Sequence, residues 1–475
     1  MKRIIKKLKI TLCALLCLAI ISVLLLGVRL LGFEGGRAVL DNGKLRAVAD
    51  VGYRFVGWES GERDEEISIY SGKGIFSVPI FEPDIIYFPV ISITTEGNKT
   101  VSSKETYVGC TVTLTGVAEE YALSGETARI KLRGNSTAGL EKKPYKLKFD
   151  EKVDLFGEGK AKEWTLLANH MDYSLVRNYI VFSVAGELDY LHYTTSVHFV
   201  DVYVNGSYEG VYTLCEQVEA GKNRVNIADG LDDLDTGYLI EMDARAPSEG
   251  ALGRDYFVAS AGQPYAIKSP DTEDEDFTAA HAEYIKKYVN DALAALDSGM
   301  WTDVTEYIDV YSFADGYLLD ELFKPCDIGF SSFYMYKDVG GKLTRGPVWD
   351  YDLSSGNSHP DEANDTGGIY SGIVNPWYAK LLNYAEFREI LAVRIEAERE
   401  AIEARIEGCF EHVSLADAAL ERNFERWDIL GRFTMEWNSD EACSIDSFDG
   451  QISFLKTWVE ESLDSLSARY APSHN

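Results

Sequence analysis

The sequence predicts an α+β fold with two lobes, in which strands fill the first half of the chain and helices the second. Three observations lead to this prediction. Short runs that alternate apolar and polar residues recur between residues 89 and 243, which is typical of half-buried strands. After residue 277, apolar residues recur at helical spacing. A pair of aspartates, Asp350 and Asp352, lies at the end of the last predicted strand, near the junction between the two halves.

Composition sets the class of protein. The chain has 475 residues, enough for one large or two ordinary domains. Its net charge of −31 argues against nucleic acid as a partner, since binding nucleic acid needs a basic surface. The 7 cysteines form no Cys-x-x-Cys pair, and the 7 histidines form no His-x-x-x-His pattern, so a zinc centre is not expected. A disulfide among the scattered cysteines stays open, because spacing alone cannot assign its pairing.

The N-terminus predicts a membrane anchor. Lysines and one arginine precede an apolar run from residue 10 to residue 28, which is long enough to span a bilayer. The basic flank should stay in the cytoplasm and the rest of the chain should lie outside it. We therefore expect an uncleaved, single-pass signal anchor over residues 1–33, a membrane-proximal segment over 34–84 and the main domain over 85–470. Secretion after cleavage of a signal peptide is the alternative.

The first half of the main domain predicts seven strands and one helix. The strands are expected at residues 89–95, 108–116, 127–134, 145–149, 197–204, 208–216 and 237–243. Asn205-Gly206 lies between two of them and is a strong signal for a hairpin turn. Asp172 is a good N-cap for a helix over residues 173–188, where apolar residues recur every fourth position.

The second half predicts helices around one strand pair. Helices are expected at residues 277–296, 310–323, 386–407 and 448–463. The strand pair is expected at residues 332–337 and 343–350.

The second strand of this pair runs into Trp349-Asp-Tyr-Asp352. In an extended chain, residues two apart point to the same side, so Asp350 and Asp352 should share one face, with Trp349 and Tyr351 on the other. Two carboxylates on one face suit a magnesium ion that also holds a phosphate, and Asn357 in the following loop could add an oxygen ligand. The alternative is a solvated turn, because Asp-x-Asp pairs are common on protein surfaces.

A cluster of basic residues runs against the acidic composition. It consists of Arg129, Lys131, Arg133, Lys142, Lys143, Lys146 and Lys148, with Glu141 as the single acidic residue between them. The polar loop 133–139, which contains Asn135 and Ser136, could present backbone N–H groups and hydroxyls to phosphates. It matches neither a Walker P-loop nor G-x-G-x-x-G. Basic solvent faces on a strand pair are the alternative. With the aspartates, the cluster would clamp a triphosphate and support phosphoryl transfer.

Several motifs occur together and in a fixed order. They are Arg133-Gly-Asn-Ser-Thr137, Lys142-Lys-Pro-Tyr-Lys-Leu-Lys-Phe149, Trp164-Thr-Leu-Leu-Ala-Asn169 with Asp172 and Arg177-Asn178, Tyr203-Val-Asn-Gly-Ser-Tyr-Glu-Gly-Val-Tyr212 with Glu216, Gly237-Tyr-Leu-Ile-Glu-Met-Asp243, and Gly346-Pro-Val-Trp-Asp-Tyr-Asp352. In this order they resemble the CotH kinase family (spore coat protein H-like atypical protein kinases), and the resemblance covers residues 85–470. It implies a diverged protein-kinase-like fold. It also implies phosphorylation of Ser or Thr in a protein acceptor, with ATP and Mg²⁺ (or Mn²⁺) as cofactors.

The resemblance also implies roles for individual residues. Asp350 would bind the metal, and Asp327 would be the catalytic or second metal-site aspartate. Lys148 is the first choice for the lysine that reaches the phosphates, with Lys146 and Lys143 as alternatives. The segment 213–217, which contains Glu216, would form the hinge that holds adenine. Glu216 could equally be a buried hydrogen-bonding carboxylate.

One residue departs from the family pattern. Pro325 stands where the family carries the Asn of an Asn-x-Asp motif, and proline has neither an amide side chain nor a backbone N–H. A catalytically weak or inactive pseudokinase that acts as a cell-surface or cell-wall binding module is therefore one alternative. Another nucleotidyl or phosphoryl transferase on the same scaffold is a second. The glutamate that pairs with the strand lysine in ordinary kinases is not fixed by the sequence, and Glu187 is equally well explained as a surface residue.

Overall fold

The structure is a computed structural model that describes residues 32–33, 36–41, 44–49, 53–64, 66–68, 78–83 and 88–471. The expected membrane span, residues 10–28, lies outside these residues. Within the described part of the chain, no helix is both long and apolar enough to cross a membrane. The chain divides into two compact units, one of residues 1–87 with 411–419 and one of residues 88–410 with 420–475.

The first unit contains two small antiparallel sheets. One has the strand order β1-β2-β3-β5 and the other pairs β4 with β6. Their bounds are Gly32–Phe33 (β1), Gly36–Asp41 (β2), Lys44–Ala49 (β3), Tyr53–Trp58 (β4), Glu66–Ser68 (β5) and Pro79–Pro83 (β6). Trp58 is buried with Leu45 and Ile67, and its indole N–H donates to the carbonyl of Asp64 at 2.8 Å. The sequence had predicted no strands in this segment.

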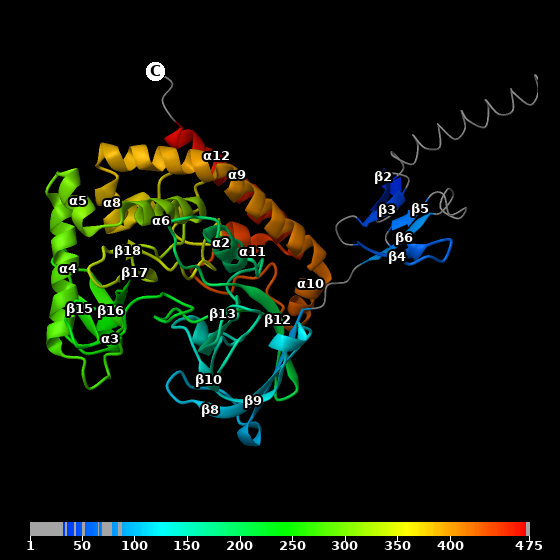
Figure 1. The fold of residues 1–475 in the computed structure, drawn as a ribbon, viewed down its shortest axis with the longest axis horizontal. Helices are drawn as coiled ribbons and strands as arrows, with labels where there is room; N and C mark the ends of the chain where they lie inside the picture. The colour runs from blue at the N-terminus through cyan, green and yellow to red at the C-terminus, as the bar shows by residue number, and fades with distance from the viewer. Residues whose placement is uncertain are drawn as a thin grey trace, which may run out of the picture. The chain divides into compact units, whose positions relative to one another are not determined.

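The second unit begins with a closed seven-stranded barrel, in the order β10-β11-β13-β12-β7-β8-β9 (Figure 1). Its strands are Val90–Thr95 (β7), Val108–Thr115 (β8), Leu123–Leu132 (β9), Tyr145–Val153 (β10), Ala161–Leu167 (β11), His198–Val204 (β12) and Ser207–Glu216 (β13). β12 runs parallel to β7, and every other neighbouring pair is antiparallel. Helix α2 (Arg177–Ala185) connects β11 to β12.

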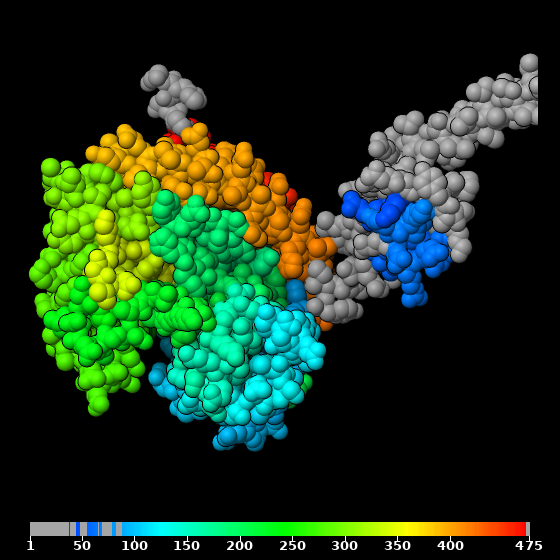
Figure 2. Space-filling model, in the orientation of Figure 1, coloured from blue at the N-terminus to red at the C-terminus, as the bar shows by residue number. Residues whose placement is uncertain are grey.

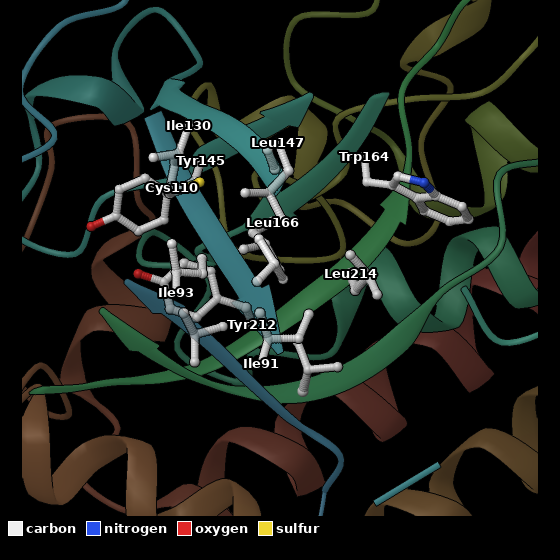
Figure 3. Packing of buried hydrophobic residues seen from close by; sticks show 14 of the residues in the cluster. Ile91, Ile93, Cys110, Ile130, Tyr145, Leu147, Trp164, Leu166, Tyr212 and Leu214 are labelled. Atoms are coloured by element: carbon white, nitrogen blue, oxygen red, sulfur yellow. The ribbon is translucent and has the colours of Figure 1, made fainter. Parts of the chain in front are cut away.

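Alternation along the strands separates the interior of the barrel from its outer face. Leu147 on β10 lies opposite Ile130 on β9, and both are fully buried in the core that Figure 3 shows. Lys146 lies opposite Lys131 in the same ladder. Because neighbouring residues on a strand point to opposite faces, the lysines project outward while the apolar residues fill the barrel.

The rest of the second unit is a five-stranded sheet with helices. The sheet has the order β15-β16-β14-β17-β18, with strands Tyr238–Met242 (β14), Tyr256–Val258 (β15), Pro264–Ser269 (β16), Phe333–Lys337 (β17) and Thr344–Arg345 (β18). The helices are Ala246–Glu249 (α3), Ala279–Asp297 (α4), Trp301–Tyr307 (α5), Val310–Phe323 (α6), Ser371–Val374 (α7), Pro376–Leu381 (α8), Ala385–Leu415 (α9), Asp417–Arg426 (α10), Asp440–Ser444 (α11) and Phe448–Tyr470 (α12). Strands thus dominate the N-terminal half and helices the C-terminal half, as predicted.

Two expected elements differ from the structure. The helix expected from residue 173 begins at Arg177, although Asp172 does accept a hydrogen bond from the backbone N–H of Arg177 at 2.8 Å. The strand expected over residues 343–350 is only β18, so Asp350 and Asp352 do not lie on a strand. The five cysteines in the described residues are free thiols.

Candidate active site

A cleft of about 1300 Å³ opens between the barrel and the second sheet. Figure 2 shows the surface hollowed between these two parts of the second unit. Its lining includes many residues that the sequence had singled out: Arg133, Asn135, Ser136, Lys146, Asp327, Asp350 and Asp352. The fold therefore brings the glycine-bounded loop of the barrel and the aspartates of the second half to the same cleft.

The loop between β9 and β10 forms one wall of the cleft. Gly134 has φ of 79°, and a Cβ atom there would lie 2.1 Å from the hydroxyl of Thr137, so only glycine fits this turn. The ammonium of Lys143 donates to the carbonyl of Ala138 at 3.0 Å and holds the far end of the loop. Lys104 donates to the side-chain oxygen of Asn135 at 2.6 Å. These contacts shape a loop whose residues 133–137 line the cleft.

Lysines on the outer face of the barrel extend this wall. Lys146 and Lys148 both form ion pairs with Glu163 on β11, the second at 2.8 Å. Lys146 lines the cleft together with Lys131, and Lys148 does not. The geometry therefore favours Lys146, the alternative, over Lys148 as the lysine that meets a ligand. Glu163, which sequence reasoning had not selected, holds it in place.

Three carboxylates form the opposite wall. Burial raises the pKa of Asp327 to about 7, and the nearby charge of Asp350 adds to this rise. Burial also raises the pKa of Asp352 well above its usual value, as do the charges of Asp350, Asp172 and Asp327. The hydroxyl of Ser331 donates to Asp327 at 2.6 Å. Ionised together, these groups repel one another, and a bound cation would relieve that repulsion.

Asp350 reaches the cleft through a turn rather than a strand. Its φ of 71° is left-handed, a conformation that Asp tolerates better than most residues. The hydroxyl of Ser332 donates to its carboxylate at 3.3 Å. Trp349, expected on the face away from the aspartates, also lines the cleft and lies 5.3 Å from the guanidinium carbon of Arg133. The predicted division into two faces is wrong for Trp349, because the backbone is not extended here.

Buried polar contacts hold the segment that carries the aspartates. The side chain of Arg177 pairs with Asp172 at 2.5 Å and donates to the carbonyls of Ser354 and Ser355 at 3.0 and 3.2 Å. The backbone N–H of Tyr351 donates to the side chain of Asn178 at 2.8 Å. The Asp172 and Arg177-Asn178 motif therefore fixes the chain on both sides of Asp352.

The hydroxyl of Tyr351 is held by a second buried ion pair, that of Asp320 and Arg345. It donates to Asp320 on α6, which also pairs with Arg345 at 3.1 Å and accepts from the hydroxyl of Tyr378 at 2.6 Å. Arg345 and Asp320 are fully buried. This network fastens the aspartate segment to the helical part of the domain.

The cleft fits a cation that arrives with a phosphate. Within the described part of the chain, no three His, Cys, Asp or Glu side chains converge to form a complete metal site. Mg²⁺ usually binds one or two carboxylates, with waters and substrate phosphates completing its shell. Asp350 and Asp352, with the repulsion described above, fit that arrangement.

A comparison with protein families gives one result. The model described as CotH kinase protein matches residues 130–466. The chain belongs to the CotH kinase family. Apart from Lys104 and Glu105, every residue that lines the cleft lies within the matched range. No curated protein matches the chain.

Besides Lys148, the expected site residues Lys143, Asn357 and Glu216 do not line the cleft. The side-chain oxygen of Asn357 accepts from Asn438 at 3.0 Å, and its amide donates to the carbonyls of Met171 and Asp352. Glu216 accepts from the backbone and hydroxyl of Ser196 at 2.7 and 2.6 Å. The side chains of Asn357 and Glu216 are buried and hold the fold together.

The expected hinge, Pro325 and Glu187 also lie mostly outside the cleft. Of residues 213–217, only Gln217 lines the cleft. Pro325 is buried and does not line the cleft, so its side chain does not contact a ligand there. Glu187 forms a surface ion pair with Arg405 instead of meeting a strand lysine.

Several charged residues of the cleft were not predicted. Lys104 and Glu105 lie on the barrel side, and the others are Glu241 and Asp243 at the end of β14, Arg245 just after it, Glu249 at the end of α3 and Lys268 on β16. Lys268 pairs with Glu241 at 2.8 Å, and Arg245 pairs with Asp243 at 3.2 Å. A signal was present, since Glu241 and Asp243 are two residues apart on a strand, like the Asp350 and Asp352 pair in the sequence.

Proposed function

We propose that this CotH family member transfers the terminal phosphoryl group of Mg·ATP (or Mn·ATP) to a Ser or Thr of a protein acceptor. The observation that carries the proposal is the cleft itself. It sets a glycine-bounded loop with Arg133 and Lys146 against the carboxylates of Asp327, Asp350 and Asp352. Phosphoryl transfer depends mainly on positioning and charge neutralisation, and the two walls supply both.

Each wall has its own task in this proposal. The loop 133–137, with Arg133 and Lys146, binds the phosphates and orients them. Asp350 and Asp352 hold the cation, which neutralises charge on the phosphate oxygens. Asp327 accepts the proton of the acceptor hydroxyl, and its raised pKa of about 7 suits a general base near neutral pH.

The proposed location follows from the N-terminal sequence. We expect the segment at residues 10–28 to anchor the protein in the cell membrane, with the kinase domain at 85–470 outside the cytoplasm. Release after signal cleavage would leave the same domain secreted. The pseudokinase alternative depends on Pro325, and the position of its side chain outside the cleft favours the active kinase.

Asp350→Asn tests the proposal. With the purified protein, Mg·ATP should raise the thermal midpoint of the wild type by mass action, and the variant should lose most of this shift. Phosphoryl transfer to an acceptor, or to the chain itself, should be abolished. Asp233→Asn, at an exposed aspartate away from the cleft, is the matched control and should behave like the wild type.

Mass spectrometry of the acceptor separates the candidate functions. A mass increase of one phosphate supports the kinase, and an increase of one nucleoside monophosphate identifies a nucleotidyl transferase. Unmodified acceptor and no nucleotide-dependent thermal shift in the wild type would refute transfer and support a binding module. A fully active, well-folded Asp350→Asn variant would remove Asp350 from the cation site.

A further inference from the structure

Arg245 is a cation on the aspartate wall of the cleft. It follows β14 and precedes the short helix α3, and it lines the cleft together with Asp327 and Asp350. Its side chain is 32% exposed, so it is accessible to a ligand there. Arg133 and Lys146 approach from the barrel, on the other wall.

The guanidinium of Arg245 is held in place from several sides. Asp243 accepts from the backbone N–H of Arg245 at 2.9 Å and from its Nε at 3.2 Å. The guanidinium carbon lies 5.8 Å from the centre of the Phe330 ring. The backbone of Phe330 donates to the carbonyl of Asp327 at 2.6 Å and accepts from Ala244 at 2.9 Å. Arg245 and the turn that carries Asp327 are thus linked through adjacent residues.

The outer nitrogens of Arg245 remain available. Asp243 binds Nε, and Nη1 and Nη2 form no hydrogen bond to any residue that the structure describes. Lys268, the other cation of this wall, is bound to Glu241 at 2.8 Å. Lys146 is bound to Glu163. Arg245 therefore presents a preorganised pair of donors, in the planar geometry that suits phosphate oxygens.

The carboxylates that line the cleft with Arg245 stabilise its positive charge. Burial lowers the pKa of Arg245. The carboxylates of Asp243, Asp327 and Asp350 raise it by more than burial lowers it, so the pKa lies above its usual value. The side chain lines the same cleft as the proposed base and the proposed cation ligand.

We propose that Arg245 is a catalytic arginine, supplied in cis, that donates Nη1 and Nη2 to the oxygens of the phosphoryl group during its transfer. This inference depends on the proposed kinase function. In the step, a bond forms between the acceptor hydroxyl oxygen and the γ-phosphorus. The bond from the γ-phosphorus to the β–γ bridging oxygen breaks, and its electron pair leaves with ADP. The hydroxyl proton passes to Asp327. Arg245 stabilises the charge on the equatorial oxygens, which is the role of an arginine finger.

Kinetics and a transition-state analogue test this role. In Arg245→Ala, kcat should fall about 100-fold or more, as when one preorganised donor is removed from a transition state. The thermal shift with Mg·ATP should be retained. The additional shift of the wild type with Mg·ADP and aluminium fluoride, which mimics the transferring group, should be lost. Arg245→Lys keeps the positive charge but not the planar pair of N–H donors, and it should recover part of kcat.

A control and a second variant keep the test decisive. Arg254→Ala removes a nearby arginine that is 54% exposed and lies outside the cleft, and it should match the wild type in every measurement. If Arg245→Ala does not fold, Arg245→Lys replaces it in the same measurements. Its kcat should fall, while its thermal shift with Mg·ATP should equal that of the wild type.

Different failures can be distinguished. Unchanged kcat and an unchanged aluminium fluoride shift in Arg245→Ala would overturn the inference. A parallel loss of the Mg·ATP shift would also overturn it, because Arg245 would then serve ground-state binding or folding. A wild type that binds no nucleotide and transfers no phosphate would refute the proposed function itself.

Discussion

Lys146 and Lys148 lie on the same face of β10 but differ in their access to the cleft. Both pair with Glu163, but only Lys146 lines the cleft. We expect Lys146→Ala to weaken Mg·ATP binding about 10-fold or more, because a hydrogen bond to a charged group contributes about 1.5–3 kcal/mol. Lys148→Ala should change the affinity little, since Glu163 keeps Lys146 as its partner. Titration calorimetry with both variants checks this.

The reverse order of effects would return Lys148 to the phosphate site. Equal, large losses in both variants would mean that Glu163 needs both lysines to hold its position. A Glu163→Gln variant distinguishes that case, because it should then weaken binding as strongly as either lysine change.

Single residues show how far sequence reasoning reaches. The period of two grouped Asp350 with Asp352 on one face, and in the structure both line the cleft. The reason differs from the prediction, since a left-handed residue and not a strand turns them there. Asn357 and Glu216 could not be judged from sequence. Whether a buried polar side chain faces a ligand or another side chain depends on distant partners, such as Asn438 and Ser196.

At the scale of elements, local signals were the most reliable. The helix expected over residues 310–323 is α6 with the same bounds. Asn205 and Gly206 have φ of 52° and 80° and form the turn between β12 and β13, as their residue types predict. The closure of the barrel was not predicted, because β7 pairs with β12 and β11 pairs with β13, and neither pair is consecutive along the chain. The sequence pattern records only which side of each strand is apolar.

The start of α2 depends on a buried ion pair. Asp172 and Arg177 are both fully buried, and Asp172 also accepts from the backbone N–H of Arg177. We expect Asp172→Ala to lower the free energy of unfolding by about 3–5 kcal/mol, because it leaves the Arg177 charge buried without its partner. Urea unfolding measures this. Phosphoryl transfer should fall as well, since Arg177 holds Ser354 and Ser355 next to Asp352.

Glu187→Gln is the matched control for that prediction. Glu187 lies just beyond the end of the same helix and pairs with Arg405 at the surface. An exposed pair contributes about 1 kcal/mol or less, so this variant should stay close to the wild type. If Asp172→Ala lowered the free energy of unfolding by only about 1 kcal/mol or less, water or another group would replace the carboxylate as the partner of Arg177.

For the whole molecule, charge is distributed against the overall composition. The chain carries −31 in total, yet the barrel wall of the cleft presents Lys104, Lys131, Arg133 and Lys146 against a single acidic residue, Glu105. A positive wall in an acidic protein attracts an anionic ligand to one place and repels it elsewhere. The carboxylates of the opposite wall need a cation before that anion can approach them, which fits a ligand that arrives as a metal complex.

The division into two units leads to the last prediction. Every residue that lines the cleft belongs to the second unit, between residues 104 and 437, and the family match covers 130–466. The barrel core and the buried networks that position the aspartates also lie in this unit. A protein that begins at residue 88 should therefore fold cooperatively. It should show the same thermal shift with Mg·ATP as a protein that begins at residue 34, and the same kcat on an unanchored acceptor. A normal fold with a lost nucleotide shift would instead show that residues 34–87 act on the cleft, and a failure to fold would show that the barrel depends on them.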